Sequence, residues 1–572
     1  MKINHLIING FMLFVSLVFI FSCRNKSEIT LARPTDIQYK WHEQERIMFA
    51  CLDPCTWQGR EYDNHSTSLL RINPSMLNTD QWCEAAISWG AKEILFVAKH
   101  TGGFCWWQTE TSDYSIRNTP YKNGKGDILG ELSESCKKYG LNLGVYVYPG
   151  DDTWGAGIGS GGKTIDPSKQ EAYNKVFRQQ LIEVLSRYGN IIEVWFDGSC
   201  IIYIDDILEK YASGSAIFQG PKASIRWPGT ESGKLYYPAW NSLDKGALAT
   251  GIATQYDDDQ DGDAWAPLEA DVTLYNHNWF WSAANEKKRR SVDELMDIYY
   301  KSVGHGGVLL LNSTPDTSGL IPEGDIERYR EFGNEIKERF ENPLATIKNK
   351  KGTYFEIALE NPSEINHAVI IEDYREGHRI REYIIEGLTG NKWELLAKGS
   401  AVGRMKIDHF PTISVSKVRV IITKNVNDPL IRSISIYNVE NYQFRPDAYE
   451  SNEWKLCGIW DTKNFVNGTG MQTIDLSSFI IKPGQYEVAF TTSVVITGMK
   501  VSKAEVYFDN DMLTQQDFIQ QGGGSNIFYI NRTAQVSAGS STILKVQMFS
   551  DNKVFQNKGE IKIRERVFDT RP

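Results

Sequence analysis

Between residues 40 and 340, short apolar runs alternate with longer stretches in which apolar positions recur every three or four residues. The apolar runs are typical of strands buried on both faces, and they cover residues 94–97, 143–148, 191–196 and 307–311. The periodic stretches are typical of amphipathic helices, and they cover residues 81–89, 128–139, 170–188 and 292–303. Strands that alternate with helices predict an α/β fold with a parallel sheet, and about 300 residues suit a (β/α)8-like barrel over residues 37–342. A doubly wound open sheet is the alternative, although no Gly-x-Gly-x-x-Gly motif opens a helix after a strand.

After residue 342 the pattern changes to short β-type runs that are separated by Asn, Pro, Gly and Asp. This pattern is typical of β-sandwiches. We therefore expect two sandwich domains, over residues 343–441 and 442–572, and we expect both to buttress the barrel.

The N-terminus has the features of an export signal. Met1 and Lys2 precede an apolar stretch over residues 11–21, which is too short for a comfortable transmembrane helix. Ile20-Phe21-Ser22-Cys23 resembles a bacterial lipobox, so residues 1–22 are expected to be a lipoprotein signal peptide and residues 23–36 a linker. The mature protein would then sit in the periplasm or outer membrane through a lipid on Cys23, with an ordinary secretory signal as the alternative.

The amino-acid composition argues against several classes of ligand and binding partner. The net charge is -10 and no basic stripe stands out, which argues against a nucleic acid. Without Cys23 seven cysteines remain and none form a Cys-x-x-Cys pair, so no disulfide framework or zinc site is indicated. Asp257, Asp259 and Asp261 imitate half of a calcium loop, but Leu268 occupies the twelfth position, so we expect a solvated acidic loop and neither a metal nor a cofactor.

The ends of the predicted strands carry polar and aromatic side chains. His100 follows one strand, Tyr146 and Tyr148 end the next, and Trp195-Phe196-Asp197 ends a third. Active sites of (β/α)8 barrels gather at the carboxyl ends of the strands, so these residues should converge. A single Asp at this place could equally cap the following helix.

A second carboxylate favours catalysis. Glu269 lies further along the chain, between Trp265 and Trp279, and nearby indole rings would raise its pKa. Glycoside hydrolysis needs one ionised carboxylate and one carboxylic acid that stays protonated near neutral pH. Asp197 and Glu269 are the predicted pair.

Five ordered segments strengthen this interpretation. Residues 98–114, 193–198, 224–233, 265–281 and 309–322 resemble glycoside hydrolase family 29, the α-L-fucosidases, and are most similar to its branch that acts on α-1,3- and α-1,4-linked fucose. The resemblance continues through residues 372–379 and implies that the first sandwich is carbohydrate-binding-module-like. It also implies a retaining mechanism with Asp197 as nucleophile and Glu269 as acid/base.

Further residues are expected to bind the sugar. Glu61 matches a family position near the sugar, and aromatic rings can stack on sugar C–H faces. The candidates are His100, Trp195, Tyr146, Tyr148, Glu61, Trp57, Trp106, Trp107, Arg226 and Trp279. For His100 and for each of Trp57, Trp106 and Trp107 core packing is the competing interpretation, and Arg226 could instead bridge loops. Cys51 and Thr101 stand where the family usually has histidines that hold sugar hydroxyls, which makes the sugar less certain than the chemistry.

Three hypotheses follow. The first is an exported retaining exo-α-L-fucosidase that acts on fucosylated oligosaccharides or glycoconjugates. The second is a glycosidase on the same scaffold that takes another sugar, such as L-galactose or a substituted fucose. The third is a carbohydrate-binding protein without turnover, against which the pair Asp197 and Glu269 argues.

Overall fold

The computed structural model describes residues 29–275 and 278–444, together with strands between residues 448 and 568. The predicted signal peptide over residues 1–22 and the lipid site at Cys23 lie outside the described residues. In the part of the chain that is described, no helix is both long enough and apolar enough to cross a membrane.

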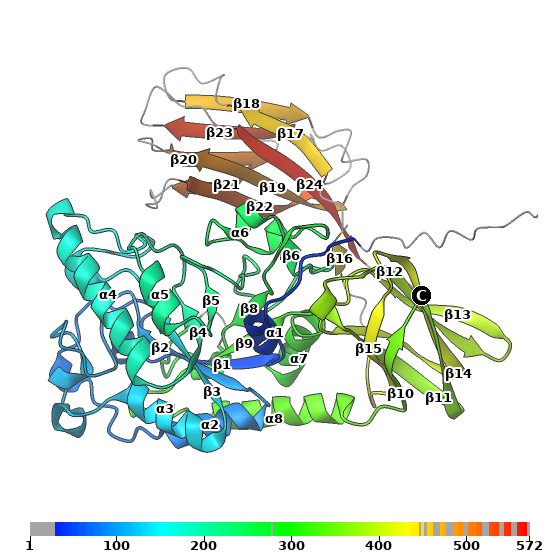
Figure 1. Ribbon diagram of the computed structural model, residues 1–572, viewed down its shortest axis with the longest axis horizontal. Helices are drawn as coiled ribbons and strands as arrows, with labels where there is room; N and C mark the ends of the chain where they lie inside the picture. The colour runs from blue at the N-terminus through cyan, green and yellow to red at the C-terminus, as the bar shows by residue number, and fades with distance from the viewer. Residues whose placement is uncertain are drawn as a thin grey trace, which may run out of the picture. The chain divides into compact units, whose positions relative to one another are not determined.

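A curled, seven-stranded parallel sheet forms the centre of the first 340 residues (Figure 1). Its strands follow the order β5-β4-β3-β2-β1-β9-β8, and every neighbouring pair is parallel. Their bounds are β1 (Arg46–Ala50), β2 (Glu93–Lys99), β3 (Asn142–Val147), β4 (Ile191–Trp195), β5 (Ala216–Phe218), β8 (Glu269–Val272) and β9 (Val308–Ser313). Between the two edge strands, Ile225 makes a single parallel bridge to Phe218 and Arg226 makes one to Leu268. The predicted α/β class with a parallel sheet is therefore confirmed.

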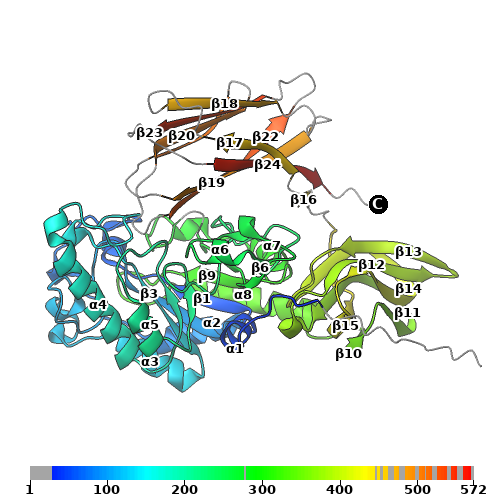
Figure 2. The same ribbon diagram turned by 45° about the horizontal axis from the view of Figure 1, so that its top comes forward.

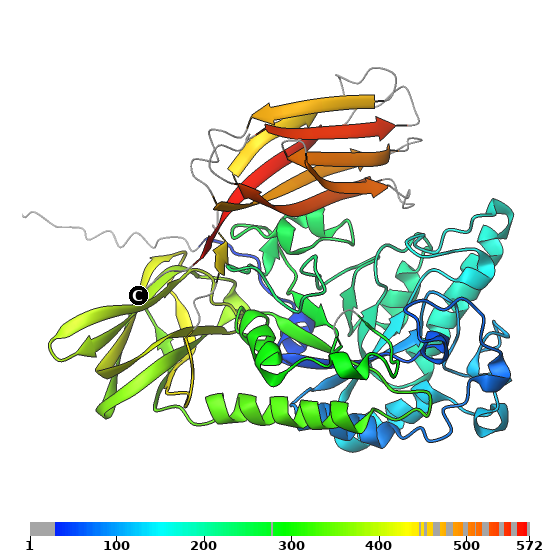
Figure 3. The ribbon, with the colours of Figure 1, turned by 180° about the vertical axis from the view of Figure 1, so that it is seen from behind.

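Helices cover the outer face of this sheet (Figure 3). They are α2 (Thr79–Ser88), α3 (Ile128–Tyr139), α4 (Gln170–Arg187), α5 (Asp205–Tyr211), α7 (Val292–Lys301) and α8 (Glu323–Phe340). The four helices predicted from periodicity are confirmed as α2, α3, α4 and α7, within two residues at each end. A short helix, α6 (Lys245–Leu248), and a two-stranded sheet of β6 (Ser242–Leu243) and β7 (Ala264–Trp265) lie in the long connection before β8.

Side chains on each strand alternate between two cores. Met48, Phe96 and Val194 point outward and pack with the helices. Leu95 and Trp195 point inward and join a second cluster inside the curl, with Phe49, Tyr146, Phe218 and Leu310. Because side chains of a strand change face at every residue, the apolar runs must be buried on both sides, as the sequence indicated.

Three glutamates occupy inward positions near the amino-terminal ends of the strands. Glu93, Glu193 and Glu269 are all fully buried, and we call them the buried glutamate layer. Helix α1 (Asp36–His42) closes this end of the sheet, where the Trp41 indole N–H donates to Glu193 at 2.6 Å. A Cβ atom on Gly144 would lie 2.3 Å from Glu93 Oε1, so any side chain at this position of β3 would have to displace Glu93.

The next domain is a six-stranded antiparallel sheet (Figure 2). Its strand order is β10-β15-β11-β14-β12-β13. The bounds are β10 (Ala345–Lys351), β11 (Tyr354–Glu372), β12 (Ile380–Thr389), β13 (Lys392–Gly399), β14 (Lys406–Asn425) and β15 (Leu430–Tyr437). The antiparallel β architecture agrees with the sequence pattern, and its arrangement as a sandwich stays a prediction.

Polar contacts join this sheet to the first 340 residues. Glu43, just after α1, accepts hydrogen bonds from Tyr374 at 2.6 Å and Arg432 at 3.0 Å. Asp261, in the acidic loop that imitates half of a calcium site, pairs with Arg381 at 3.0 Å. That loop therefore makes a contact between domains. No group of His, Cys, Asp or Glu side chains suited to a metal ion occurs among the described residues.

The C-terminal strands form a five-stranded and a four-stranded antiparallel sheet. The first sheet contains β16 (Ala448–Glu450), β17 (Lys455–Asp461), β19 (Gly484–Val495), β22 (Ser525–Val536) and β24 (Lys558–Phe568). The second contains β18 (Thr469–Asp475), β20 (Val501–Phe508), β21 (Asp511–Asp517) and β23 (Ile543–Ser550). A β-rich C-terminal segment is confirmed.

Candidate active site

Asp197 lies two residues after the end of β4, in a backbone conformation that few side chains adopt. Its φ is +53°, and Gly198 follows with φ +113°. Asp tolerates the left-handed region better than most residues, and such strained positions cluster at functional sites. The turn leaves Asp197 open to solvent, and Tyr146 on β3 donates its hydroxyl to Asp197 Oδ2 at 2.8 Å.

The surroundings of Asp197 raise its pKa. Loss of hydration is the main cause, the hydrogen bond from Tyr146 lowers the pKa, and the negative charge of Glu231 raises it. Glu231 is therefore near enough for its charge to act on Asp197.

A loop after residue 226 brings Glu231 to this position. Ser232 bridges Val272 of β8, and the Gly233 N–H donates to the Asp271 carbonyl at 2.9 Å, so the loop folds back over the end of β8. Glu231 is exposed, and the Trp279 indole N–H donates to its Oε2 at 3.3 Å. Asp197 and Glu231 are thus two solvent-accessible carboxylates at the carboxyl end of the sheet.

Asp271 is a third carboxylate at the same end. It is buried on β8, and the Trp227 indole N–H donates to its Oδ1 at 2.7 Å. Burial raises its pKa well above the usual value, and the charges of Glu231 and Asp197 raise it further. Asp197, Glu231 and Asp271 are called the carboxylate cluster below.

The prediction that Glu269 serves as acid/base disagrees with this geometry. Glu269 begins β8 and belongs to the buried glutamate layer, two residues before Asp271 on the same face of the strand. Its Oε2 accepts the Trp195 indole N–H at 2.7 Å, and burial raises its pKa to about 8. A fully buried carboxyl group beneath Trp195 cannot reach a substrate at Asp197, so we assign Glu269 a structural role.

Five of the predicted sugar-binding residues gather around the carboxylate cluster. The His100 ring stacks on the Tyr62 ring with 6.0 Å between ring centroids, and it lies 5.8 Å from the Tyr146 ring by the same measure. Burial lowers the pKa of His100 to about 4, so the imidazole is neutral and can both donate and accept hydrogen bonds. Tyr148 lies 6.3 Å from Tyr146, between ring centroids, and its hydroxyl accepts the Gly159 N–H at 2.7 Å.

Glu61 and Trp279 complete this group. The Trp279 N–H donates to Glu61 Oε2 at 3.2 Å, which ties the loop after β1 to the loop after β8. The pKa of Glu61 is raised to about 7, mainly by burial and in part by the charge of Glu231.

Other predicted ligands belong to the core. Trp106 and Trp107 are fully buried, and their indole N–H groups donate to the Leu52 carbonyl at 2.7 Å and to Glu183 at 2.9 Å. Trp57 packs on Trp106 with 6.2 Å between ring centroids and is half-buried. The competing interpretation, core packing, is thus correct for Trp106 and Trp107.

Arg226 and Trp195 contact other groups of the protein. Arg226 is 1% exposed, and its guanidinium donates to Asp258 at 2.9 Å and to the carbonyls of Trp240, Thr254 and Ala266, so it bridges loops. The Trp195 ring stacks on Phe218 with 3.7 Å between centroids and on Tyr146 with 5.8 Å. Both side chains are buried, and the partners shown here are groups of the protein itself.

The two departures from the family pattern are buried small side chains. Cys51 follows β1, and the side chain of Asn312 hydrogen-bonds its thiol. Thr101 Oγ1 lies 3.5 Å from Nδ1 of His100. Cys51 also packs in the apolar cluster inside the curl, which contains Phe49 and Tyr146.

The matching family model is Alpha-L-fucosidase, over residues 38–339, which is more than half of the chain. The chain belongs to the α-L-fucosidase family, glycoside hydrolase family 29. The enzyme is thus a glycoside hydrolase of the α-L-fucosidase type, as the sequence predicted, whereas the α-1,3/1,4 branch stays a prediction.

Individual relatives agree with this assignment. The fucosidase is 30% identical to Alpha-L-fucosidase 1 of Arabidopsis thaliana, over 71% of this chain and 88% of that protein. A crystal structure of a proposed α-L-fucosidase from Bacteroides thetaiotaomicron VPI-5482 is 30% identical, with a TM-score of 0.67 over 72% of this chain and all of that one. A glycoside hydrolase 29 family member from an unknown rumen bacterium is 25% identical, with a TM-score of 0.64 over 95% of this chain and 99% of that one.

The role of Glu269 can be tested by substitution. Glu269→Gln keeps an oxygen that accepts the Trp195 N–H, so we expect kcat/KM for a fucosylated oligosaccharide, whose leaving group needs a proton, to stay within about tenfold of wild type. Glu269→Leu removes the acceptor and leaves a buried N–H unsatisfied, which costs about 1–3 kcal/mol and should lower the melting temperature. Steady-state kinetics and calorimetry measure both. A loss of about 10²–10⁴-fold in the Gln variant would restore Glu269 as the general acid.

Proposed function

We propose that this family member is a retaining exo-α-L-fucosidase that releases α-1,3- or α-1,4-linked fucose, with Asp197 as nucleophile and Glu231 as acid/base. The observation that carries the proposal is the pairing of Asp197, fixed by Tyr146, with an exposed Glu231 whose charge acts on it. The linkage rests on the resemblance of five segments to the α-1,3/1,4 branch. Ile225 and Arg226, which bridge β5 to β8, would serve as the eighth strand of a closed barrel.

The proposed reaction has two displacements. In the first, an Asp197 carboxylate oxygen bonds to the anomeric carbon of fucose, the glycosidic C–O bond breaks, and Glu231 gives its proton to the leaving oxygen. In the second, Glu231 takes a proton from water as the water oxygen bonds to the anomeric carbon, and the bond to Asp197 breaks. The neutral His100 and the tyrosines Tyr146 and Tyr148 would hold the sugar hydroxyls.

The second candidate is a related glycosidase that acts on an L-galactoside or a substituted fucoside. Cys51 and Thr101 favour it, because smaller side chains at two positions that usually hold histidine would change which hydroxyls find a partner. L-Galactose differs from L-fucose by one hydroxyl group. A protein that binds fucosylated glycans without turnover is the remaining alternative.

The catalytic roles predict different responses to two leaving groups. Asp197→Ala should lower kcat by about 10⁴-fold or more on every substrate, because no bond to the sugar can form. Glu231→Gln should lower kcat/KM by about 10²–10⁴-fold on a fucosylated oligosaccharide, and by much less on a nitrophenyl fucoside, whose leaving group needs no proton. Identification of the released sugar would measure the linkage and would separate fucose from L-galactose.

Asp271→Asn is the matched control for the acid/base. Asp271 also lies in the carboxylate cluster, but it is buried and bonded to Trp227. If Asp271→Asn lowers kcat/KM much more on the oligosaccharide than on the nitrophenyl fucoside, and Glu231→Gln does not, then Asp271 is the acid/base and Glu231 is not.

The pH dependence should shift in opposite directions in two variants. The acid limb of kcat/KM for a nitrophenyl fucoside reports the ionisation of Asp197 in the free enzyme. Tyr146→Phe removes a hydrogen bond that lowers the pKa of Asp197, so the limb should move to higher pH. Glu231→Gln removes a charge that raises this pKa, so the limb should move to lower pH. Equal shifts in both variants would exclude Asp197 as the titrating group.

We also propose that the enzyme is exported and lipidated on Cys23, on the strength of the segment Ile20-Phe21-Ser22-Cys23. Labelled palmitate supplied to a bacterial host should enter the wild-type protein in the membrane fraction. Cys23→Ser should carry no label, while a Cys200→Ser control should carry it. Label in the Cys23→Ser protein, or none in the wild type, would leave an ordinary secretory signal as the explanation.

A further inference from the structure

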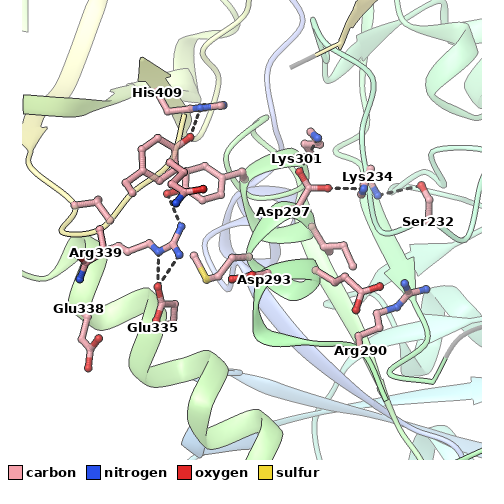
Figure 4. Close-up of a pocket in the computed structure, with 18 of the residues that line it drawn as sticks. Ser232, Lys234, Arg290, Asp293, Asp297, Lys301, Glu335, Glu338, Arg339 and His409 are labelled. Carbon is pink, nitrogen blue, oxygen red and sulfur yellow. Dashed lines mark hydrogen bonds and ion pairs between the residues drawn. The ribbon is translucent and has the colours of Figure 1, made fainter. Parts of the chain in front are cut away.

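A groove with a volume of about 1860 Å³ is lined in part by Glu231 of the carboxylate cluster. Figure 4 shows other residues of its lining, among them Asp297, Arg339 and His409. Trp227 and Glu231 line one end, helix α7 and the last turns of α8 line its length, and His409 of β14 and residues 438–443 line the other end. Pockets for small ligands have volumes of about 300–1000 Å³, and α7 alone is about 15 Å long. The groove is therefore larger than a site for one sugar.

The walls of the groove are polar and held in place. Asp297 on α7 lies between two lysines, with Lys234 Nζ at 2.5 Å and Lys301 Nζ at 2.6 Å. On the facing wall, Arg339 donates to Glu335 of α8 at 2.7 Å. Side chains that are already fixed can hydrogen-bond to hydroxyl groups without a further loss of conformational entropy.

The charges in the groove select against anions. Seven carboxylates face four lysines and arginines. The carboxylates are Glu231, Asp293, Glu294, Asp297, Glu335, Glu338 and Glu440, and the cations are Lys234, Arg290, Lys301 and Arg339. The excess of negative charge would repel sialylated or sulfated glycans, so that among glycans the neutral chains are the suitable ligands.

The end of the groove beside Glu231 offers an aromatic surface. Trp227 is half-buried, and its indole N–H is already bonded to Asp271 at 2.7 Å, so the ring cannot turn freely. A fixed indole face suits the C–H face of the first sugar beyond the cleaved bond.

We propose that this groove binds the neutral oligosaccharide to which the fucose is attached, as an extended site for the leaving group. The proposal rests on the proposed function, because it places the glycosidic bond at Glu231. The substrates are then longer neutral fucosylated chains, and binding of the chain contributes to kcat/KM in addition to binding of fucose.

Calorimetric titration with a neutral, defucosylated oligosaccharide tests the groove without turnover. Glu338→Trp fills the groove at an exposed position of α8, and we expect about a tenfold weaker Kd. Glu134→Trp, at an exposed position of α3 outside the groove, is the matched control and should bind like wild type. A sialylated version of the same oligosaccharide should bind wild type at least about tenfold more weakly.

Kinetics give a second measurement. In wild type, kcat/KM should be higher for longer fucosylated oligosaccharides than for an aryl fucoside. Glu338→Trp should lower the ratio of the oligosaccharide value to the aryl fucoside value by about tenfold. The proposal is wrong if wild type does not bind the neutral oligosaccharide, if both Trp variants bind it equally, or if the sialylated chain binds as tightly. If wild type hydrolyses no fucoside, the proposed function fails, and the titration still decides whether the groove binds glycan.

Discussion

The hydrogen bond from the Trp195 indole to Glu269 is the contact on which the proposed catalytic geometry depends. It fixes a ring that stacks on Phe218 on one side and on Tyr146 on the other. Tyr146 in turn donates to Asp197, two residues after Trp195. Because a buried indole N–H without a partner costs about 1–3 kcal/mol, the acceptor below the ring must be present for this stack to hold one orientation. The orientation of Asp197, the proposed nucleophile, is thus set from the inside of the sheet.

Much of the fold could be predicted from periodicity. The runs at 94–97 and 191–196 became β2 and β4, and the stretch 128–139 became α3, because burial on two faces and amphipathic spacing each leave a clear pattern. Asp197 could also be found, since it directly follows an apolar run. The strands near residues 47 and 217 are short and carry weaker signals, and the sequence pattern alone does not give the order of strands in the sheet.

The sequence pattern led to Glu269 as acid/base and not to Glu231, which we propose, for a geometric reason. Glu269 and Asp271 both point inward from β8, and a period of two residues cannot tell which lies at the carboxyl end. To tell the two residues apart, one must know where the strand starts, and β8 starts at Glu269 itself. Glu231 lies in a loop that folds over β8, so its position depends on contacts of Ser232 and Gly233 that leave no periodic pattern. The one available signal was its place within residues 224–233, a segment that resembles the family and contains Glu231 as its one carboxylate.

Depth inside the curled sheet separates the roles of the carboxyl groups. Burial raises the pKa values of Glu93, Glu193 and Glu269, and the charge of Glu269 raises that of Glu193 further. Buried carboxyl groups that keep their protons add little negative charge below the active site. Asp197, by contrast, is open to solvent and accepts a hydrogen bond from Tyr146, so it can ionise. A carboxyl group therefore supports the fold where it is buried and protonated, and it suits the proposed role of nucleophile where it reaches the surface and accepts a hydrogen bond that favours its ionised form.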